Sequence, residues 1–191
     1  MIHLCRRSLA LLFLLSLAAS GGETWTGSSD VKFHGSSTLH DFDGTVSGVP
    51  LKVTVRPGAN GRLVDATSEV KVKEMDTADA KRDANMMTMF KEAQFHLIKI
   101  EVSGAEERAL KPQPGKPGSM PVSLTIAGTR GKVNGVVTNV SEAPDKVEFD
   151  LALPVSLKAF SLEPPKVIGG LIKVRDTVDV TAHVVLKKAA E

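Results

Sequence analysis

The chain has 191 residues and a nearly balanced charge, with 24 Lys and Arg against 22 Asp and Glu. This length suits one domain with a sizeable core. Binding to nucleic acid needs clustered cationic side chains that replace the counterions of the phosphates, whereas acidic and basic residues are interspersed throughout this chain. The composition therefore argues against a nucleic-acid-binding protein.

The first twenty residues are predicted to be a secretory signal peptide rather than part of the fold. Arg6 and Arg7 precede an apolar run from Leu9 to Ala19, and small residues follow it. A membrane-spanning helix needs roughly 20 apolar residues, so an uncleaved membrane anchor is the less favoured alternative. We expect residues 1–20 to be removed on export to the periplasm, leaving a single domain over residues 23–191.

The only cysteine is Cys5, which precedes the apolar run and would leave with the signal peptide. The exported protein would then contain no disulfide, and it would lack the cysteine that a lipid anchor requires. Loss of Arg6 and Arg7 also reduces Lys and Arg from 24 to 22, equal to the 22 acidic residues, so the side-chain charge becomes close to zero.

Alternation of apolar and polar residues dominates the chain after residue 22 and predicts eight to ten half-buried strands. The clearest strands are expected over residues 49–55, 64–72, 122–126, 147–153 and 178–186. Weaker ones are expected over residues 31–34, 38–46, 95–102, 132–140 and 171–174. Asn60 and Gly61 predict a hairpin turn, and the prolines within residues 103–119 predict a long exposed loop there.

Residues 77–90 lack this alternation and are rich in Ala and Met, which predicts the one real helix, with Asp76 as its N-cap. On that helix Met86, Met87 and Phe90 would share a face. This face either packs on the sheet as part of the structure or forms a lid over a pocket. Methionine suits a lid because its flexible thioether adapts to irregular apolar ligands.

Antiparallel strands with one apolar face can form a filled sandwich or a closed barrel, and the periodicity does not choose between them. A barrel of about eight strands can hold a small ligand in its interior. The residues expected to line such a cavity and its lid are Phe42, Val53, Val70, Met86, Met87, Phe90, Leu124, Ile126, Phe149, Leu151, Phe160, Val180 and Val184.

Candidate catalytic residues are sparse, because the part after the signal peptide has four histidines and neither cysteine nor tyrosine. In a strand, His40 and Phe42 would face one way and Asp41 and Asp43 the other, so the stretch His40 to Asp43 does not present a histidine and a carboxylate on one surface. No serine lies in a G-x-S-x-G motif. We therefore predict no catalytic residue, no metal site and no cofactor.

Several segments carry a family resemblance: Ser37 to Gly44, Met75 to Asp76, Arg82 to Met86, Leu124 to Thr129, Phe160 to Pro165, and Gly170 to Val178. Together they resemble the YceI-like family of exported lipid-binding proteins. The resemblance implies an all-β fold: an antiparallel, lipocalin-like barrel of about eight strands around a long isoprenoid or acyl chain, with one short helix covering one end. Asn85 and Ala127 stand where the family often has histidine, which implies a different head-group selectivity.

The leading hypothesis is a non-catalytic periplasmic carrier of an apolar small molecule, of the isoprenoid or fatty-acyl type. The main alternative is a packed β-domain without a ligand that acts through protein contacts in the cell envelope. A lipid-modifying enzyme is a weaker alternative, because it would need a polar cluster inside the barrel. The sequence leaves open whether the chain forms a homodimer.

Overall fold

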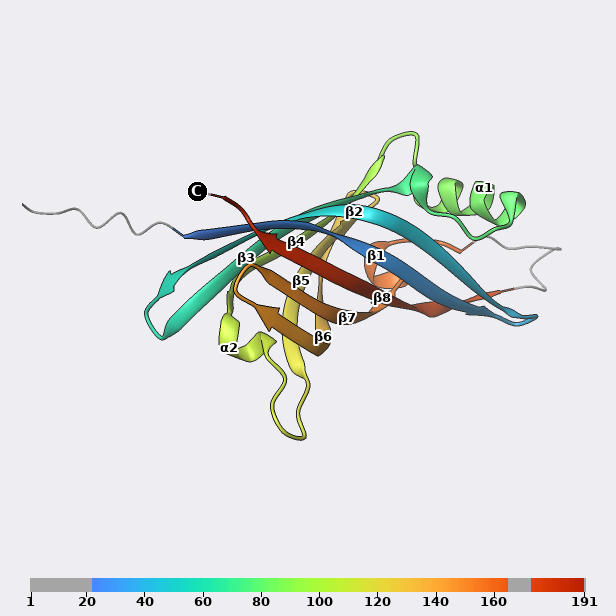
Figure 1. Cartoon of the computed structure of the whole chain (residues 1–191). Helices are drawn as coiled ribbons and strands as arrows, with labels where there is room; N and C mark the ends of the chain where they lie inside the picture. Colours follow the sequence, from blue (N-terminus) through green and yellow to red (C-terminus); the bar gives the residue numbers. More distant parts are fainter. Residues whose placement is uncertain (1–21, 165–172, 191) are drawn as a thin grey trace, which may run out of the picture.

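The structure, a computed structural model, describes residues 22–164 and 173–190, so the expected signal peptide lies outside the described residues (Figure 1). Its strands are β1 (Glu23–Ser37), β2 (Asp41–Gly58), β3 (Gly61–Lys71), β4 (Leu97–Glu106), β5 (Gly118–Ile126), β6 (Thr129–Ala143), β7 (Lys146–Ser156) and β8 (Val174–Lys188). Two α-helices, α1 (Ala80–Met89) and α2 (Glu107–Leu110), and two short 3-10 helices, Val72–Glu74 and Lys158–Phe160, connect them.

The eight strands form a closed antiparallel barrel. Each strand pairs with the next one along the chain, and β1 pairs with β8, which closes the sheet. Closure leaves no sheet edge and creates an interior toward which every second residue of a strand points. The prediction of an all-β, antiparallel barrel is thus confirmed, and the alternative of a sandwich is excluded.

Two predicted strands, 38–46 and 49–55, are one continuous strand, β2. The register with β1 shifts between Ser29 and Val31, whose partners are Val49 and Val46, so β2 carries an extra residue there. Gly48 adopts a φ of 65° in this β-bulge. The bulge places both Val46 and Val49 in the interior although they are three residues apart, which interrupts the alternation that defines a strand in the sequence.

Similar irregularities occur in two other strands. Gly104 of β4 has a φ of 60° beside a register shift, and its amide donates to Oδ1 of Asp65 at 2.7 Å. Asn139 of β6 has a φ of 52° beside another shift, and its side chain donates to Oδ2 of Asp150 at 2.7 Å. Bulges bend and twist a strand, so these positions help the sheet to curve into a barrel.

The helix is shorter than predicted, and its N-cap is Asp79 rather than Asp76. Ala78 has a φ of 56°, which a right-handed helix cannot include, so α1 begins after it. The side chain of Asp76 instead accepts a hydrogen bond from the amide of Ala78 at 2.7 Å. Of the described helices, none is long and apolar enough to cross a membrane.

The expectation of one long loop over residues 103–119 is wrong. Strand β4 continues to Glu106, the second helix α2 follows, and β5 begins at Gly118, so only residues 111–117 lie outside these elements. The predicted hairpin at Asn60 and Gly61 is confirmed, with Gly61 at a φ of 130°. The predicted strand 171–174 and the family-like stretch Gly170 to Val178 both fall partly outside the described residues.

Because the strands are antiparallel, the connections of the barrel divide between two ends. The connection that contains α1 lies at the same end as the β1–β2 and β5–β6 turns, and this is called the α1 end. The connection that contains α2 lies with the β2–β3 and β6–β7 turns and with the start of β1, and this is called the α2 end. Figure 1 shows the two helices at opposite ends of the barrel.

Candidate functional site

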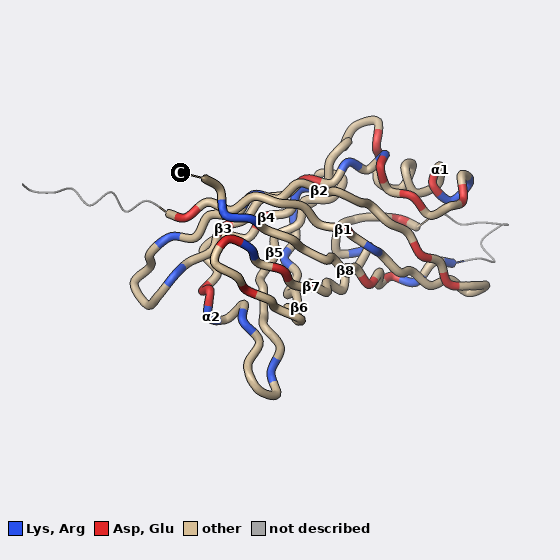
Figure 2. Tube along the Cα trace, in the orientation of Figure 1, with Lys and Arg blue, Asp and Glu red and all other residues tan. Residues whose placement is uncertain are grey.

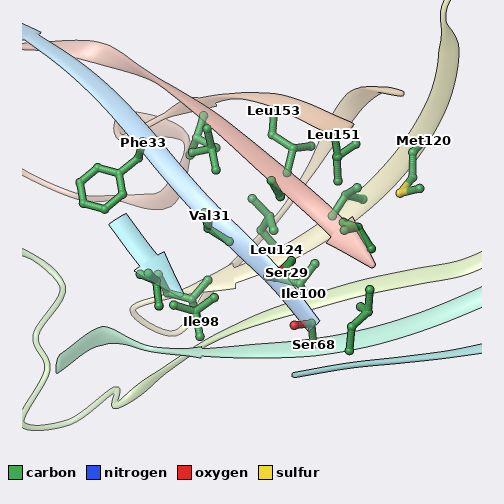
Figure 3. Close-up of a pocket in the computed structure, with 18 of the residues that line it drawn as sticks. Ser29, Val31, Phe33, Ser68, Ile98, Ile100, Met120, Leu124, Leu151 and Leu153 are labelled. Carbon is green, nitrogen blue, oxygen red and sulfur yellow. The ribbon is translucent and has the colours of Figure 1, made fainter. Parts of the chain in front are cut away.

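The interior of the barrel holds a cavity of about 750 Å³. Ligand pockets typically measure 300–1,000 Å³, so this volume suits a small molecule. All eight strands contribute lining residues, and Val, Leu, Ile, Phe and Met predominate among them (Figure 3). The cavity is therefore a site for a largely apolar molecule.

Small side chains at inward-facing positions explain why the interior is not filled. Ser29, Ala66, Ser68 and Ala182 all line the cavity, on strands β1, β3 and β8. In an eight-stranded barrel the inward side chains can just fill the interior, so small residues at these positions leave space. The cavity thus follows from the sequence of the wall.

Eleven of the thirteen residues predicted to line the cavity do so: Phe42, Val53, Val70, Met86, Phe90, Leu124, Ile126, Phe149, Leu151, Val180 and Val184. They come from six elements, counting Phe90 with α1 as its C-cap, so the barrel brings together residues that are far apart in the sequence. Whether they contact a ligand remains a prediction.

Met87 and Phe160 do not line the cavity, contrary to the prediction. Met89 takes the place expected of Met87, because positions 86, 89 and 90 share the inward face of α1. The ring of Phe160 is 1% exposed and lies so close to Gly131 that a Cβ there would be 2.8 Å from it. Phe160 is therefore part of the packed core rather than of the cavity surface.

The sequence reasoning missed several lining residues, among them Trp25, Ser29 and Phe33 of β1 and Met120 of β5. Phe33 follows Val31 at the spacing of a strand face, which was a usable signal. Trp25 and Ser29 are separated by Gly27, so the first half of β1 has no apolar alternation to recognise.

At the α1 end, a set of hydrogen bonds holds the helix at the rim of the cavity. Asp79 caps α1 by accepting from the amides of Lys81 and Arg82, each at 3.0 Å. Thr77 donates through its hydroxyl to Asp83 at 2.6 Å. The guanidinium carbon of Arg82 lies 5.3 Å from the centre of the Phe42 ring, within the range of a cation–π contact.

Two positions where the sequence departs from the family pattern have different surroundings. Asn85 lines the cavity from α1. Ala127 lies in the β5–β6 turn with a φ of 47° and packs against the core without lining the cavity. Of these two positions, Asn85 is the one that faces the cavity.

The α2 end carries a chain of ion pairs between side chains that also line the cavity. Glu142 of β6 pairs with Lys111 at 2.9 Å, and Lys111 pairs with Glu107 at 3.4 Å. Arg62 of β3 pairs with Glu107 at 3.3 Å and with Glu23 of β1 at 2.7 Å. These pairs link three strands and α2 across this end of the barrel.

The charges of these groups respond to their partners. The hydrogen bond with Glu142 raises the pKa of Lys111, and the one with Lys188 lowers the pKa of Glu23. Both shifts favour the ionised forms that make the pairs. Because the side chains are partly exposed, each pair contributes little to stability, and salt would weaken it.

Two histidines form exposed pairs with aspartates on the outside of the barrel. His34 pairs with Asp43 at 2.8 Å and His183 with Asp150 at 2.8 Å, each across two neighbouring strands and exposed. Among the described residues, no three His, Cys, Asp or Glu side chains are placed to hold a metal ion.

Figure 2 shows Lys, Arg, Asp and Glu interspersed along the trace, as the sequence indicated.

Comparison with known proteins identifies the family of this chain. A model of the YceI-like domain matches residues 25–186, which span β1 to β8. The chain belongs to the YceI-like family. No curated protein sequence matches it significantly.

Solved structures share the barrel. A polyisoprenoid binding domain from Saccharophagus degradans, implicated in plant cell wall breakdown, matches with a TM-score of 0.65 at 14% identity, over 87% of this chain and 98% of that one. Burkholderia cenocepacia BcnA matches with a TM-score of 0.63 at 18% identity, over 82% of this chain and 95% of that one. At such low identities these likenesses establish the fold.

Proposed function

We propose that this YceI-like protein is a non-catalytic carrier that holds an apolar chain molecule, of the isoprenoid or fatty-acyl type, inside its barrel. The observation that carries the proposal is the apolar cavity of about 750 Å³. Moving hydrocarbon from water to such a surface is favourable by about 0.8 kcal/mol for each buried CH₂ group. The relative from Saccharophagus degradans, described as polyisoprenoid-binding, supports this ligand class.

The cavity favours a carrier over the two alternatives. In a packed β-domain that acts only through protein contacts, the interior would be filled, whereas small side chains such as Ala66 and Ala182 on the inner wall leave it open. A lipid-modifying enzyme would need acid, base or nucleophile groups within the apolar part. The charged lining residues instead belong to α1 and its N-cap at one end, and to the ion pairs of the α2 end at the other. His40 lies in the β1–β2 turn at the α1 end, and the apolar part between the two ends contributes serine hydroxyls but, among the described lining residues, no acid or base.

The carrier proposal is tested on protein purified from the organism that produces it. Native mass spectrometry, followed by organic extraction, should find an apolar molecule in near-stoichiometric amount. The delipidated protein should then bind a fluorescent lipid probe and lose it to the extracted molecule. Protein that carries no such molecule and binds no probe would contradict the proposal and favour the packed domain.

We further propose that the protein is exported to the periplasm and that residues 1–20 are removed as a signal peptide. The charged Arg6 and Arg7 before a short apolar run support this proposal. The mass of the intact protein from the periplasmic fraction tests it. A mass that still includes Met1 to Ala18 would contradict cleavage and favour the alternative of an uncleaved membrane anchor.

A further inference from the structure

One hydroxyl in the cavity wall lacks a protein partner. Among the described residues, the buried polar side chains are Ser29, Ser68 and Thr77. The hydroxyl of Thr77 donates to Asp83 at 2.6 Å, and that of Ser68 donates to the carbonyl of Pro50 at 2.7 Å. Within residues 22–164 and 173–190, the hydroxyl of Ser29 makes no hydrogen bond, although Ser29 is only 8% exposed. Every fully buried side-chain oxygen or nitrogen among these residues has a partner, so the Ser29 hydroxyl is open to the cavity that Ser29 lines.

The backbone fixes the Ser29 side chain toward the cavity. Ser29 lies beside the β-bulge of β2, where the next residue, Asp30, accepts a hydrogen bond from the amide of Gly48 at 3.0 Å. Residues 29 and 30 of the strand face opposite sides of the sheet, so this outward contact holds Ser29 inward. Figure 3 shows Ser29 among apolar side chains such as Val31 and Ile100.

A ligand that fills the cavity would separate this hydroxyl from water and leave it without a hydrogen bond, which is unfavourable. An apolar residue at the same place would avoid this cost. A ligand atom that hydrogen bonds to the hydroxyl would recover it. The structure thus contains a polar point on a wall that otherwise suits hydrocarbon.

The surroundings of Ser29 indicate which polar atom fits. Its neighbours in register are Val184 on β8 and Val49 on β2, both buried. A carboxylate or phosphate would lose its hydration here and gain a single donor in return, which is strongly unfavourable. A carbonyl or hydroxyl oxygen loses far less and can bond to one serine.

We propose that Ser29 hydrogen bonds to an uncharged oxygen, a carbonyl or hydroxyl, that the ligand carries within the barrel. The ligand would then be an apolar chain with an oxygen function located midway along β1, rather than pure hydrocarbon or a molecule with its only polar group at the rim. This inference rests on the proposed carrier function and specifies its ligand.

The test compares two ligands that differ only in a carbonyl: dinonyl ketone, whose carbonyl lies at mid-chain, and nonadecane. Both are delivered from methyl-β-cyclodextrin to the delipidated protein, where they compete with diphenylhexatriene. The ratio of ketone to alkane affinity should fall by about twofold to tenfold in Ser29→Ala, because one hydrogen bond is lost. The alkane should bind Ser29→Ala at least as well as the wild type.

Ser28→Ala is the matched control, because Ser28 is the exposed neighbour on the outer face of the same strand. It should leave the ratio unchanged. A second readout needs no variant: in the wild type, the infrared carbonyl band of the bound ketone should lie at lower wavenumber than in alkane solvent.

An unchanged affinity ratio in Ser29→Ala, or a carbonyl band at its alkane-solvent position, would overturn the inference while the carrier function stands. If neither molecule displaces the probe and no probe binds, both proposals fail.

Discussion

Replacing Ala182 by tryptophan should block the cavity without disturbing the barrel. Ala182 lies on β8 between Val31 of β1 and Leu151 of β7, and all three residues line the cavity. An indole at this position would extend into the space that a ligand uses. In a filled interior the same change would cause strain and cost about 1–3 kcal/mol of stability.

The expected loss of affinity follows from the hydrocarbon that the indole displaces. Burial of each CH₂ group contributes about 0.8 kcal/mol, so displacing only three of them weakens binding by about 2.4 kcal/mol. This corresponds to an affinity roughly fiftyfold lower. The urea midpoint of the delipidated variant should be at least as high as that of the wild type, since the added side chain enters open space and buries apolar surface there.

The control is Thr181→Trp, which places the same side chain on the exposed outer face of β8. Binding is measured by titration with a fluorescent lipid probe, and stability by urea unfolding followed by circular dichroism. If Ala182→Trp is clearly destabilised while its probe affinity matches that of Thr181→Trp, the interior is filled and the reasoning is refuted.

Three further predictions concern α1 and the outer surface. Met86→Glu should weaken probe binding far more than Met87→Glu, because only Met86 lines the cavity; equal effects would contradict the placement of α1. Asp79→Ala should lower the free energy of unfolding by about 1 kcal/mol in urea, since two capped amides lose their acceptor, and Asp79→Asn should retain most of it. The hydrogen bond with Asp43 raises the pKa of His34, so its NMR titration should shift to lower pH in Asp43→Asn; because folding raises this pKa, the pair stabilises the fold at pH values below the ordinary histidine pKa, and that contribution disappears as the pH rises through the raised value.

Strand positions were predictable where alternation was uninterrupted, as in β7, and less so where a bulge occurs. Val46 and Val49 both point inward but are three residues apart, so the sequence indicated two strands instead of β2. The signal for the bulge was Gly48, whose positive φ favours glycine. The local sequence around Gly48 could not show that the side chain of Asp30, on β1, accepts a hydrogen bond from the Gly48 amide.

The start of the helix was misplaced because two aspartates, Asp76 and Asp79, both suit an N-cap. Asp76 is fixed by long-range contacts, since its backbone pairs with Thr45 of β2 through two hydrogen bonds of 2.8 and 3.0 Å. These contacts keep Asp76 paired with the barrel wall, so α1 can begin only after it. Tertiary structure, rather than propensity, therefore determines which aspartate caps the helix.

Barrel closure and the cavity were the features least accessible from periodicity. Closure depends on pairing between β1 and β8, which are separated by almost the whole chain, and only the family resemblance indicated it. The cavity depends on where small residues occur within apolar faces. At Ser29, Ala66 and Ala182, larger side chains would bury more apolar surface and stabilise an empty barrel. Their presence has a physical reason if a ligand supplies the missing packing, and in that case folding stability and ligand affinity should respond in opposite directions when these positions are enlarged.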